Sequence, residues 1–317
     1  MTHLIIDADP IVYRCGFAAE TPTYHLVMED PVTGIYEAVF APYDGKTAGA
    51  RMQKWIQDHP DDQVLEKEKV VYPEPESHAL EAVRTQLYSI EKECREHYAV
   101  DDFERVTVIL SGPGNYREKL ATIVPYKGNR DPAHKPYWYQ AIRNYLTGTW
   151  GAVVVHGREA DDECSIIGHN SEPGSYIIAT IDKDLDQIPG NHYNYLKQVF
   201  YANSADDGER FFWQQVISGD ATDGVPGCFR VGELRARRLA DDVIGEARPA
   251  DRRPNLWAAV VAAYARSKAI PGCPYVESSA EAVALETARL VYLQQQEGEL
   301  WIPTGPPHAR LEEYVDE

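Results

Sequence analysis

Short runs of β-branched and other apolar residues recur along the chain and predict the strands of a sheet. The runs lie at residues 3–6 (HLII), 106–110 (VTVIL), 153–155 (VVV) and 176–180 (YIIAT), and segments with helical spacing separate them. Because the apolar residues do not alternate with polar ones, the runs are typical of strands that are buried on both faces of a parallel sheet. We therefore predict an α/β fold with a mostly parallel central sheet flanked by helices.

A long insertion, roughly residues 20–105, lies between the first two predicted strands. Its sequence YHLVMEDPVTGIYEAVF predicts a hairpin. Apolar residues at three- and four-residue steps from Leu80 to Cys94 predict an amphipathic helix over residues 77–98. These patterns assign no function to the insertion.

From about residue 205 the strand signals give way to helical spacing. Helices are predicted over residues 211–218, 232–242, 256–266 and 280–296. The chain is therefore predicted to have two parts. Residues 1–204 form a sheet domain that contains the insertion, and residues 205–317 form a helical region packed on it.

The chain is acidic, with 31 Lys and Arg against 50 Asp and Glu and a formal net charge of −19. Its overall field does not attract nucleic acid, so nucleic-acid binding would require a local basic patch. The five cysteines form no CxxC pair, which favours a reducing compartment. The chain has neither a basic leader nor an apolar stretch of membrane-spanning length, so we expect a soluble, cytoplasmic protein without a membrane partner.

Acidic residues gather where the predicted strands end. The first strand runs into DAD, the third is followed by GREADDE and the fourth by IDKDLD, and a further pair stands in GDATDG. Because the carboxyl ends of parallel strands meet at one edge of a sheet, we expect these acids to converge there. The residues concerned are Asp7, Asp9, Glu159, Asp161, Asp162, Asp182, Asp184, Asp220 and Asp223.

A cluster of carboxylates needs cations, because the neighbouring negative charges repel one another. Oxygen ligands suit Mg²⁺ or Mn²⁺, and two such ions can stabilise the attacking and leaving oxygens of a phosphodiester displacement. The alternative interpretation is that each acid caps a helix or lies solvated in a loop. We expect Asp9, Glu163 and Asp186 to support the site or lie at the surface rather than bind metal.

Several motifs resemble those of the bacteriophage and bacterial 5′-3′ exonucleases and flap endonucleases, which have a PIN-like nuclease domain. The motifs are LIIDAD at the N-terminus, YREKL and PYKGNR between residues 116 and 130, EADDE at 159–163, IDKDLDQIPG, GDATDGVPG at 219–227, and ARLVYL with ELWIP between 288 and 303. They stand in the family order over residues 1 to about 303, and the insertion contributes nothing to the match.

The resemblance implies roles for particular residues. Two Mg²⁺ ions, for which Mn²⁺ would substitute, are expected on Asp7, Glu159, Asp161, Asp162, Asp182, Asp184 and Asp223, with Asp220 in support. Lys127 and Arg130 are expected to act on the scissile phosphate, because the transition state gathers charge on the non-bridging oxygens. The alternative for this basic pair is a solvated loop.

The segment from residue 219 to 239 resembles the helix-turn-helix element with which the family binds duplex DNA. Backbone at its glycines and charge from its arginines would contact phosphates without reading sequence. The residues concerned are Gly224, Gly227, Gly232, Arg235, Arg237 and Arg238. The family often binds K⁺ in this turn, but Arg230 stands where the first glycine of its Gly-x-Gly is usual, which disfavours K⁺ here.

A second departure concerns the end of the second predicted strand, where the family has an aspartate. This chain has Ser111 and Gly112 in the sequence VILSGPGNYR. We hypothesise that Asp9 takes over the missing ligand position, which requires the chain to stay extended through Ala8. On this hypothesis Gly112→Asp would rescue an Asp9 variant.

The aromatic and basic segment at residues 134–145 (HKPYWYQAIRNY) lies where relatives carry an arch that admits single-stranded 5′ ends. Tyr137, Trp138 and Tyr139 could stack on bases while Lys135 and Arg143 contact phosphates. The alternative is an amphipathic helix whose aromatic residues pack against the protein.

The prediction from the sequence is a metal-dependent 5′-3′ exonuclease that acts on DNA ends, with flap endonuclease or RNA-primer removal as further activities and an RNA–DNA hybrid as a further partner. On this reading residues 1–204 are the nuclease domain and residues 205–317 bind DNA, in the host bacterial cytoplasm if a phage encodes the protein. Two alternatives stay open. One is a catalytically weakened DNA-binding relative, and the other is a PIN-type ribonuclease.

Overall fold

A computed structural model describes residues 2–42, 47–131, 134–172, 174–246, 249–303 and 308–310. The chain forms two compact units. Unit 1 comprises Met1–Pro10, Ser89–His134 and Thr147–Glu317, and unit 2 comprises Ile11–Tyr88 and Lys135–Leu146. The strands expected in the sheet domain and the C-terminal helices both fall in unit 1, and the boundary between residues 204 and 205 stays a prediction.

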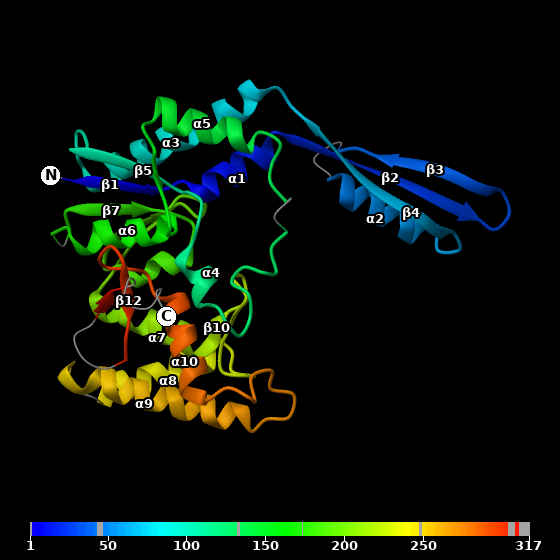
Figure 1. Cartoon of the computed structure of the whole chain (residues 1–317). Helices are drawn as coiled ribbons and strands as arrows, with labels where there is room; N and C mark the ends of the chain where they lie inside the picture. Colours follow the sequence, from blue (N-terminus) through cyan, green and yellow to red (C-terminus); the bar gives the residue numbers. More distant parts are fainter. Residues whose placement is uncertain are drawn as a thin grey trace. The chain divides into compact units, whose positions relative to one another are not determined.

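The central sheet of unit 1 has six strands in the order β6-β5-β1-β7-β8-β9. Its strands β5, β1 and β7 lie side by side (Figure 1). All neighbours pair in parallel except β8 and β9, which are antiparallel. The prediction of a mostly parallel central sheet is therefore confirmed. The strands are β1 (His3–Asp7), β5 (Arg105–Ser111), β6 (Val153–Val155), β7 (Tyr176–Ala179), β8 (Gly190–Asn194) and β9 (Val199–Asn203).

Strand β1 lies in the middle of this sheet, and the side chains of Leu4, Ile5 and Ile6 are fully buried. The buried Ile5 packs with Ile109 of β5 and with residues of helix α6 (Ala160–His169) and the 3₁₀ helix η1 (Lys183–Gln187). Burial on both faces explains why β1 is uniformly apolar up to Asp7. Its carboxyl end brings Asp7 to the edge of the sheet where the other acidic segments also begin.

Helices predominate in unit 1 after residue 204: α7 (Ala205–Ser218), α8 (Glu233–Glu246), α9 (Pro249–Lys268) and α10 (Ala280–Val291). Their shared core contains Trp213, Leu256 and Tyr264. The predicted helices are confirmed, but α10 ends at Val291 and not at residue 296, because Tyr292 has an extended backbone. The shorter elements of unit 1 are α4 (Tyr116–Leu120), β10 (Gly219–Asp220), β11 (Val225–Pro226), β12 (Glu299–Trp301) and β13 (His308–Arg310).

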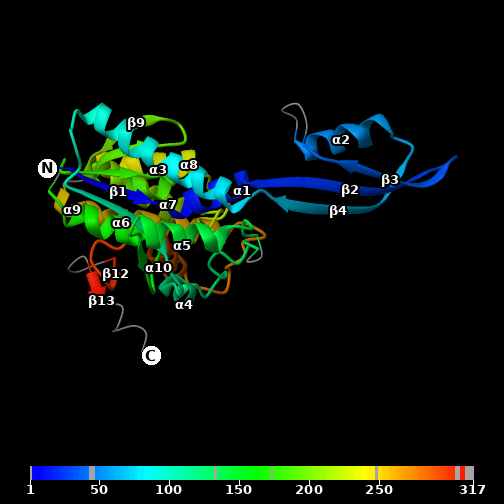
Figure 2. The same cartoon turned by 90° about the horizontal axis from the view of Figure 1, so that it is seen from above.

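Unit 2 contains an antiparallel sheet of β2 (Glu20–Asp30), β3 (Gly34–Phe40) and β4 (Gln63–Pro73), in the order β3-β2-β4. Helix α2 (Ala48–Asp58) lies against one face of this sheet (Figure 2). Its Met52 packs with Leu26 and Met28. The pairing of β2 with β3 confirms the predicted hairpin. The predicted long helix is also confirmed as α3 (Glu76–Tyr98), which with α1 (Asp9–Ala18) and α5 (Tyr139–Thr149) crosses from one unit into the other.

No helix in the described ranges combines the length and the apolar composition that crossing a membrane requires.

Candidate active site

Asp7 lies at the carboxyl end of β1 with only 1% of its surface exposed. Its carboxylate accepts hydrogen bonds from the Thr180 hydroxyl at 2.9 Å and from the backbone N–H of Asp9 at 3.3 Å. Burial, and then the nearby charge of Asp9, raise the pKa of Asp7 to about 8. Thr180 also accepts from the backbone N–H of Asp182 at 3.0 Å, so one buried hydroxyl joins two of the acidic segments.

Helix α6 brings its acids into the site with its first turn. Glu159 precedes the helix as its N-cap residue, and Asp161 is its second residue. Burial raises the pKa of Asp161 well above its usual value, and the neighbouring charges of Asp7 and Asp182 raise it further. Asp161 therefore lies among other carboxylates, as the parallel-sheet argument predicts.

Asp162 has a different environment. It is fully buried and forms a two-armed ion pair with Arg117 of α4, at 2.6 and 2.8 Å. The backbone N–H groups of Glu159 and Gln294 donate to the same carboxylate at 3.2 and 3.1 Å. Because Asp162 is fully buried and paired with Arg117, we leave it out of the proposed set of metal ligands, and its role as a ligand stays a prediction.

Asp182 and Asp184 flank Lys183 at the start of η1. The Asp182 carboxylate accepts from the backbone N–H of Asp184 at 2.9 Å, which begins the turn. Burial is the main cause that raises the pKa of both residues, to about 7 for Asp184, where the charges of Asp182 and Asp220 add to the effect. The Asp184 carboxylate also accepts from the side chain of Gln215 at 2.7 Å.

Asp220 ends strand β10, and Asp223 stands in the loop between β10 and β11. Asp220 is 4% exposed, accepts from the backbone N–H of Thr222 at 2.7 Å, and lies 3.4 Å from the ammonium group of Lys183. Asp223 accepts from the hydroxyl of Tyr126 at 2.9 Å. The same hydroxyl lies 2.8 Å from Glu159, so Tyr126 links the loop to the start of α6.

Lys127 and Arg130 of the PYKGNR segment lie against these acids. Lys127 forms an ion pair with Glu159 and has its ammonium group 3.4 Å from Asp223, and Arg130 forms an ion pair with Asp223. Lys127 has a φ of +55°, a conformation that is uncommon for residues other than glycine. Its backbone N–H donates to the carbonyl of Asp223 at 2.7 Å, which stabilises this turn. Such backbone strain is typical of functional sites.

The pKa of Glu159 is shifted in the opposite direction to the pKa of its acidic neighbours. Burial acts to raise its pKa, but the charges of Lys127 and Arg117 outweigh burial, and the pKa of Glu159 is lowered. Glu159 is therefore compensated by basic side chains, whereas burial, followed by the charges of neighbouring carboxylates, raises the pKa of Asp7, Asp161 and Asp184.

We call the seven acids that remain without Asp162 the carboxylate cluster: Asp7, Glu159, Asp161, Asp182, Asp184, Asp220 and Asp223. Five of them line one cavity of about 10 Å³ together with Arg117 and Tyr126. This volume is on the order of one water molecule. The cluster thus draws together acidic segments that are far apart in the sequence.

Within the described ranges, no three or more His, Cys, Asp or Glu side chains are arranged so that they could hold a metal ion. The contacts above give the reason, because several carboxylates are turned toward local donors such as Lys127, Arg130 and Gln215. The donor set nevertheless fits a hard divalent cation in its chemistry, since it consists of carboxylate oxygens.

The structure contradicts the premise of the Asp9 hypothesis. Asp9 begins helix α1, so the chain does not stay extended, and its carboxylate accepts from the backbone N–H of Ser111 at 3.0 Å. Gly112 donates its N–H to the carbonyl of Val155 at 2.6 Å, and a Cβ at this position would lie 2.2 Å from that oxygen. An aspartate at Gly112 therefore requires the backbone to shift, and the rescue by Gly112→Asp stays a prediction.

The glycines expected to bind DNA lie in the segment before helix α8, and the arginines lie in the helix itself. Gly227 approaches the backbone of Ser218 so closely that a Cβ would lie 2.1 Å from its carbonyl carbon, and Gly224 has a φ of +69°. Gly232 directly precedes α8 and accepts from the N–H groups of its first turn. The three arginines, Arg235, Arg237 and Arg238, are exposed.

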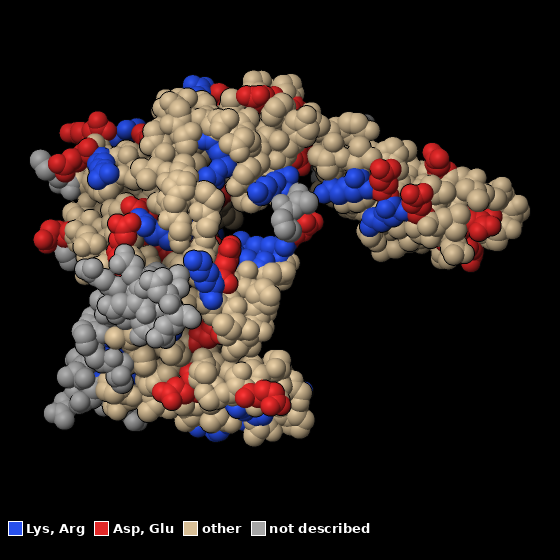
Figure 3. Space-filling view, viewed as in Figure 1, with Lys and Arg blue, Asp and Glu red and all other residues tan. Residues whose placement is uncertain are grey.

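Arg230 adopts a φ of +62°, so this turn has a glycine-like backbone although an arginine stands there. On the face shown in Figure 3, basic and acidic side chains lie intermingled.

The aromatic segment before α5 lies in unit 2. Trp138 donates its indole N–H to the carbonyl of Glu74 at 2.8 Å, and the ring of Tyr139 lies 5.5 Å from that of Tyr13. Tyr137 is 64% exposed. The packing interpretation therefore fits Trp138 and Tyr139, and stacking on bases stays a hypothesis for Tyr137.

Sequence reasoning missed three residues that hold the site together: Arg117, Thr180 and Gln215. Arg117 stands in the quoted YREKL motif, so the motif could have indicated it. Nothing local distinguishes Thr180 or Gln215 from other polar residues, because their partners are remote in the sequence.

Comparisons with family models and with curated proteins found no match. Among solved structures, the chain is similar to the T5 D15 protein co-crystallised with metal ions, at 14% identity over 92% of this chain and 89% of that chain, with a TM-score of 0.49. It is also similar to a bacteriophage T5 D15 flap endonuclease in complex with DNA and metal ions, at 17% identity over 64% and 90%, with a TM-score of 0.40. A T5 5′-exonuclease mutant matches at 13% identity over 90% and 99%, with a TM-score of 0.42.

Proposed function

We propose that the protein is a divalent-metal-dependent nuclease that hydrolyses phosphodiester bonds at the 5′ ends of DNA. The observation that carries this proposal is the convergence of the carboxylate cluster with Lys127 and Arg130 at the carboxyl edge of the sheet. The motif resemblance agrees with this function. Negative charge alone would repel a phosphodiester, so the adjoining basic pair is what makes the site suitable for one.

The proposed metal ligands are Asp7, Asp161, Asp182, Asp184 and Asp220, with Glu159 and Asp223 joining them when their basic partners turn to the substrate. Divalent ions bound there would supply an activated water and offset the charge of the phosphate oxygens. Mg²⁺ is the proposed ion, with Mn²⁺ as a substitute, and K⁺ is not part of the proposal.

Lys127 and Arg130 have a role that depends on exchange of partners. Lys127 is paired with Glu159 and Arg130 with Asp223, and the Tyr126 hydroxyl joins these two carboxylates. Moving the two cations from Glu159 and Asp223 to the phosphate would stabilise the charge that develops on its non-bridging oxygens. The released carboxylates would then be free to coordinate metal.

The turn before α8 is the proposed contact to duplex DNA. Backbone at Gly224, Gly227 and Gly232 and charge from Arg235, Arg237 and Arg238 would hold phosphates and set the position of the scissile bond. Because these contacts involve only the DNA backbone, they predict binding without sequence preference.

The test is cleavage of 5′-labelled duplex, 5′-flap and RNA-primed DNA in Mg²⁺, in Mn²⁺ and in excess EDTA. We expect metal-dependent release from DNA 5′ ends, loss of that activity in Asp182→Asn, and no change in Asp242→Asn, which alters an exposed acid on α8. Full activity in EDTA, or wild-type rates in Asp182→Asn, would overturn the metal-dependent mechanism.

A second candidate is a non-catalytic DNA-binding relative, and the environment of Gly112 favours it because an acid there requires the backbone to shift. It predicts duplex binding that Arg235→Ala with Arg238→Ala weakens, without cleavage in any metal. Cleavage of RNA alone would instead identify the third alternative, a ribonuclease.

A further inference from the structure

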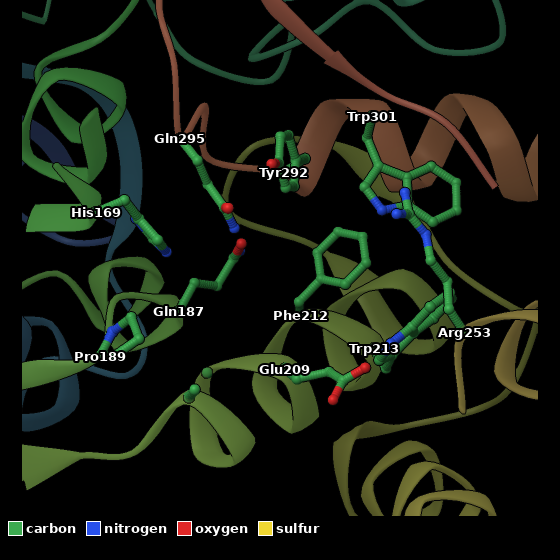
Figure 4. A pocket seen from close by; sticks show the side chains of 12 residues that line it. His169, Gln187, Pro189, Glu209, Phe212, Trp213, Arg253, Tyr292, Gln295 and Trp301 are labelled. Atoms are coloured by element: carbon green, nitrogen blue, oxygen red, sulfur yellow. The ribbon is translucent and has the colours of Figure 1, made fainter. Parts of the chain in front are cut away.

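A pocket of about 350 Å³ lies in unit 1, separate from the cavity of the carboxylate cluster. Helix α7, η1, the end of α6 and the segment after α10 contribute to its walls (Figure 4). Its volume is within the range of small-molecule sites. The proposed nuclease function does not use this pocket.

One end of the pocket is aromatic and rigid. Phe212 contacts Trp301 and Tyr292 with ring centroids 5.6 and 5.7 Å apart. Both partners are nearly buried, because Trp301 also packs on Trp213 and the Tyr292 hydroxyl donates to Glu299. These side chains are therefore held in place before any ligand arrives, which reduces the entropy cost of binding.

The other end of the pocket is polar, with His169, Gln187 and Gln295 converging there (Figure 4). The side-chain amide of Gln187 is already hydrogen-bonded within the protein, because it donates to Gln215 and to the carbonyl of Val291. The side-chain amide of Gln295 makes no hydrogen bond with any described residue and offers both a donor and an acceptor.

His169 supplies a further acceptor at this end. Its Nδ1 lies 2.9 Å from the carbonyl of Ser165, which can only accept, so Nδ1 carries the proton and Nε2 is an acceptor. Burial lowers the pKa of His169, which keeps the ring neutral at pH 7. The polar end thus presents one donor and two acceptors.

The charge of the pocket is balanced. Arg253 lies over the ring of Trp301 at 5.4 Å, and Glu209 is the carboxylate on the pocket wall. A phosphate would meet Glu209 as well as Arg253, so the pocket favours a ligand without net charge. A flat, neutral ring with hydrogen-bonding atoms on one edge fits both ends of the pocket.

We propose that this pocket binds a nucleobase that carries an amino group beside a ring nitrogen, as adenine and cytosine do. The base would pack against Phe212, its amino group would donate to His169 Nε2 or to the Gln295 carbonyl, and its ring nitrogen would accept from the Gln295 amide. Glutamine pairs with the edge of adenine by the same donor and acceptor combination.

The pocket is connected to the carboxylate cluster by side-chain hydrogen bonds. Gln187 donates to Gln215 at 2.8 Å, and Gln215 donates to Asp184 at 2.7 Å. A base packed against Gln187 therefore lies two hydrogen bonds from a proposed metal ligand. The binding proposal itself does not depend on nuclease activity.

The test measures binding of adenosine to the full chain in EDTA, by titration calorimetry and by tryptophan fluorescence, since Trp213 and Trp301 line the pocket. Inosine is the matched probe because a carbonyl replaces the amino group. We expect saturable adenosine binding and about tenfold weaker inosine binding, which corresponds to the loss of one good base contact.

Three variants make the test specific. Gln295→Ala should weaken adenosine binding about tenfold, whereas Gln296→Ala, which changes an exposed neighbour outside the pocket, should leave it unchanged. Ala205→Trp adds bulk to an exposed residue on the pocket wall and should abolish binding. Circular dichroism melting would show that all three variants fold.

An oligonucleotide containing adenine and its abasic counterpart distinguish the two sources of the base. Competition by the first strand alone assigns the pocket to a base within a strand, and competition by neither strand assigns it to free nucleoside. The absence of saturable adenosine binding, equal binding of inosine, or unchanged binding to Gln295→Ala would overturn the proposal.

Discussion

Two groups of ion pairs lie close together in unit 1 and differ in how completely they are enclosed. The closed group is Arg117 with Asp162, whose side chains are 2% and 0% exposed. Arg117 also donates to the carbonyls of Leu290 at 2.9 Å and Tyr292 at 2.6 Å. Most of the hydrogen-bonding capacity of both side chains is therefore used inside the protein.

The open group is Lys127 and Arg130 with Glu159 and Asp223, joined by the hydroxyl of Tyr126. Its basic side chains are 23% and 50% exposed, so each can turn away from its carboxylate into solvent. The two groups nearly touch, since the guanidinium of Arg117 lies 3.6 Å from Glu159.

The same kind of ion pair can therefore stabilise the fold or take part in catalysis, depending on how far it is enclosed. A buried pair with all its donors and acceptors matched costs much to disrupt, because removing one partner leaves the other charged and desolvated. The open group is only partly enclosed, since Arg130 is 50% and Lys127 23% exposed, so water can replace some of its contacts and breaking it should cost less than breaking the closed group. We therefore expect the closed group to hold the fold together and the open group to carry the chemistry.

The largest expected effect follows from breaking the closed group. Arg117→Met should lower the free energy of unfolding by about 3–5 kcal/mol, because it leaves Asp162 as an uncompensated buried charge. Urea unfolding followed by circular dichroism measures the change. Lys119→Met alters an exposed residue of the same helix and is the control. A loss below about 1 kcal/mol, the range of surface pairs, would contradict the assignment.

Breaking the open group should affect the rate and not the fold. Lys127→Met should reduce single-turnover cleavage of 5′-labelled DNA by about 10²–10³-fold, the usual cost of removing one group that stabilises transition-state charge. Its urea midpoint should stay near that of wild type. A wild-type rate would show that Lys127 only balances Glu159.

Adding an acid at Gly112 tests whether the site lacks a carboxylate. Gly112→Asp should destabilise unit 1 by about 1–3 kcal/mol, since the new side chain collides with the carbonyl of Val155. Gly148→Asp places the same side chain where a Cβ meets nothing within 4 Å, and serves as the control. Higher activity with unchanged stability in Gly112→Asp would show that the backbone adjusts and that an acid is useful there.

The pH dependence of the metal-free protein separates the acids with raised pKa values from the paired ones. The pKa of Asp7 is raised to about 8 and that of Asp184 to about 7, so the folded state holds protons that the unfolded state has released. Their contribution to stability is present below pH 4 and is lost as the pH rises toward about 8.

We therefore expect the melting temperature in EDTA to fall between about pH 5 and pH 8. The fall should be smaller in Asp184→Asn than in wild type or Asp242→Asn, and Mg²⁺ should raise the melting temperature most at the alkaline end. Parallel melting curves for Asp184→Asn and wild type would show that Asp184 is not protonated in the folded state.

The smallest expected effect concerns the link within the open group. Tyr126→Phe removes one hydroxyl that donates to Glu159 and Asp223, and should cost about 1 kcal/mol. Tyr116→Phe removes a hydrogen bond of 3.5 Å and should cost less. Thermal unfolding of the two variants measures the difference, and an equal loss in both would show that the hydroxyl of Tyr126 does not stabilise the group.

Much of the fold could be predicted from local sequence. The strands β1, β5, β6 and β7 followed from uninterrupted apolar runs, because a strand buried on both faces needs no polar side chain. Strands β8 and β9 did not follow, since GNHYN and VFYAN are short and partly polar. Strand β8 pairs with the edge of β7, whose backbone groups need hydrogen-bond partners, and β9 pairs with β8. The residues of β8 and β9 themselves do not indicate this pairing.

The end of α10 is a second feature that the local sequence does not predict. Helical spacing continues to residue 296, yet the helix ends at Val291. The next residues turn toward the sheet, where the N–H of Gln294 donates to Asp162. The segment after the helix is thus held by a buried carboxylate 132 residues away in the sequence.

That acids from several segments gather at one edge of the sheet follows from their positions in the sequence, because parallel strands end on the same side. Which basic residue each acid meets depends instead on how remote segments pack together. Glu159, Asp161 and Asp162 stand within one short motif, but successive residues of a helix point about 100° apart, so each enters a different environment. Asp162 meets the buried Arg117 and becomes part of the framework. Glu159 meets Lys127, which is 23% exposed, and this contact is less enclosed than that of Asp162.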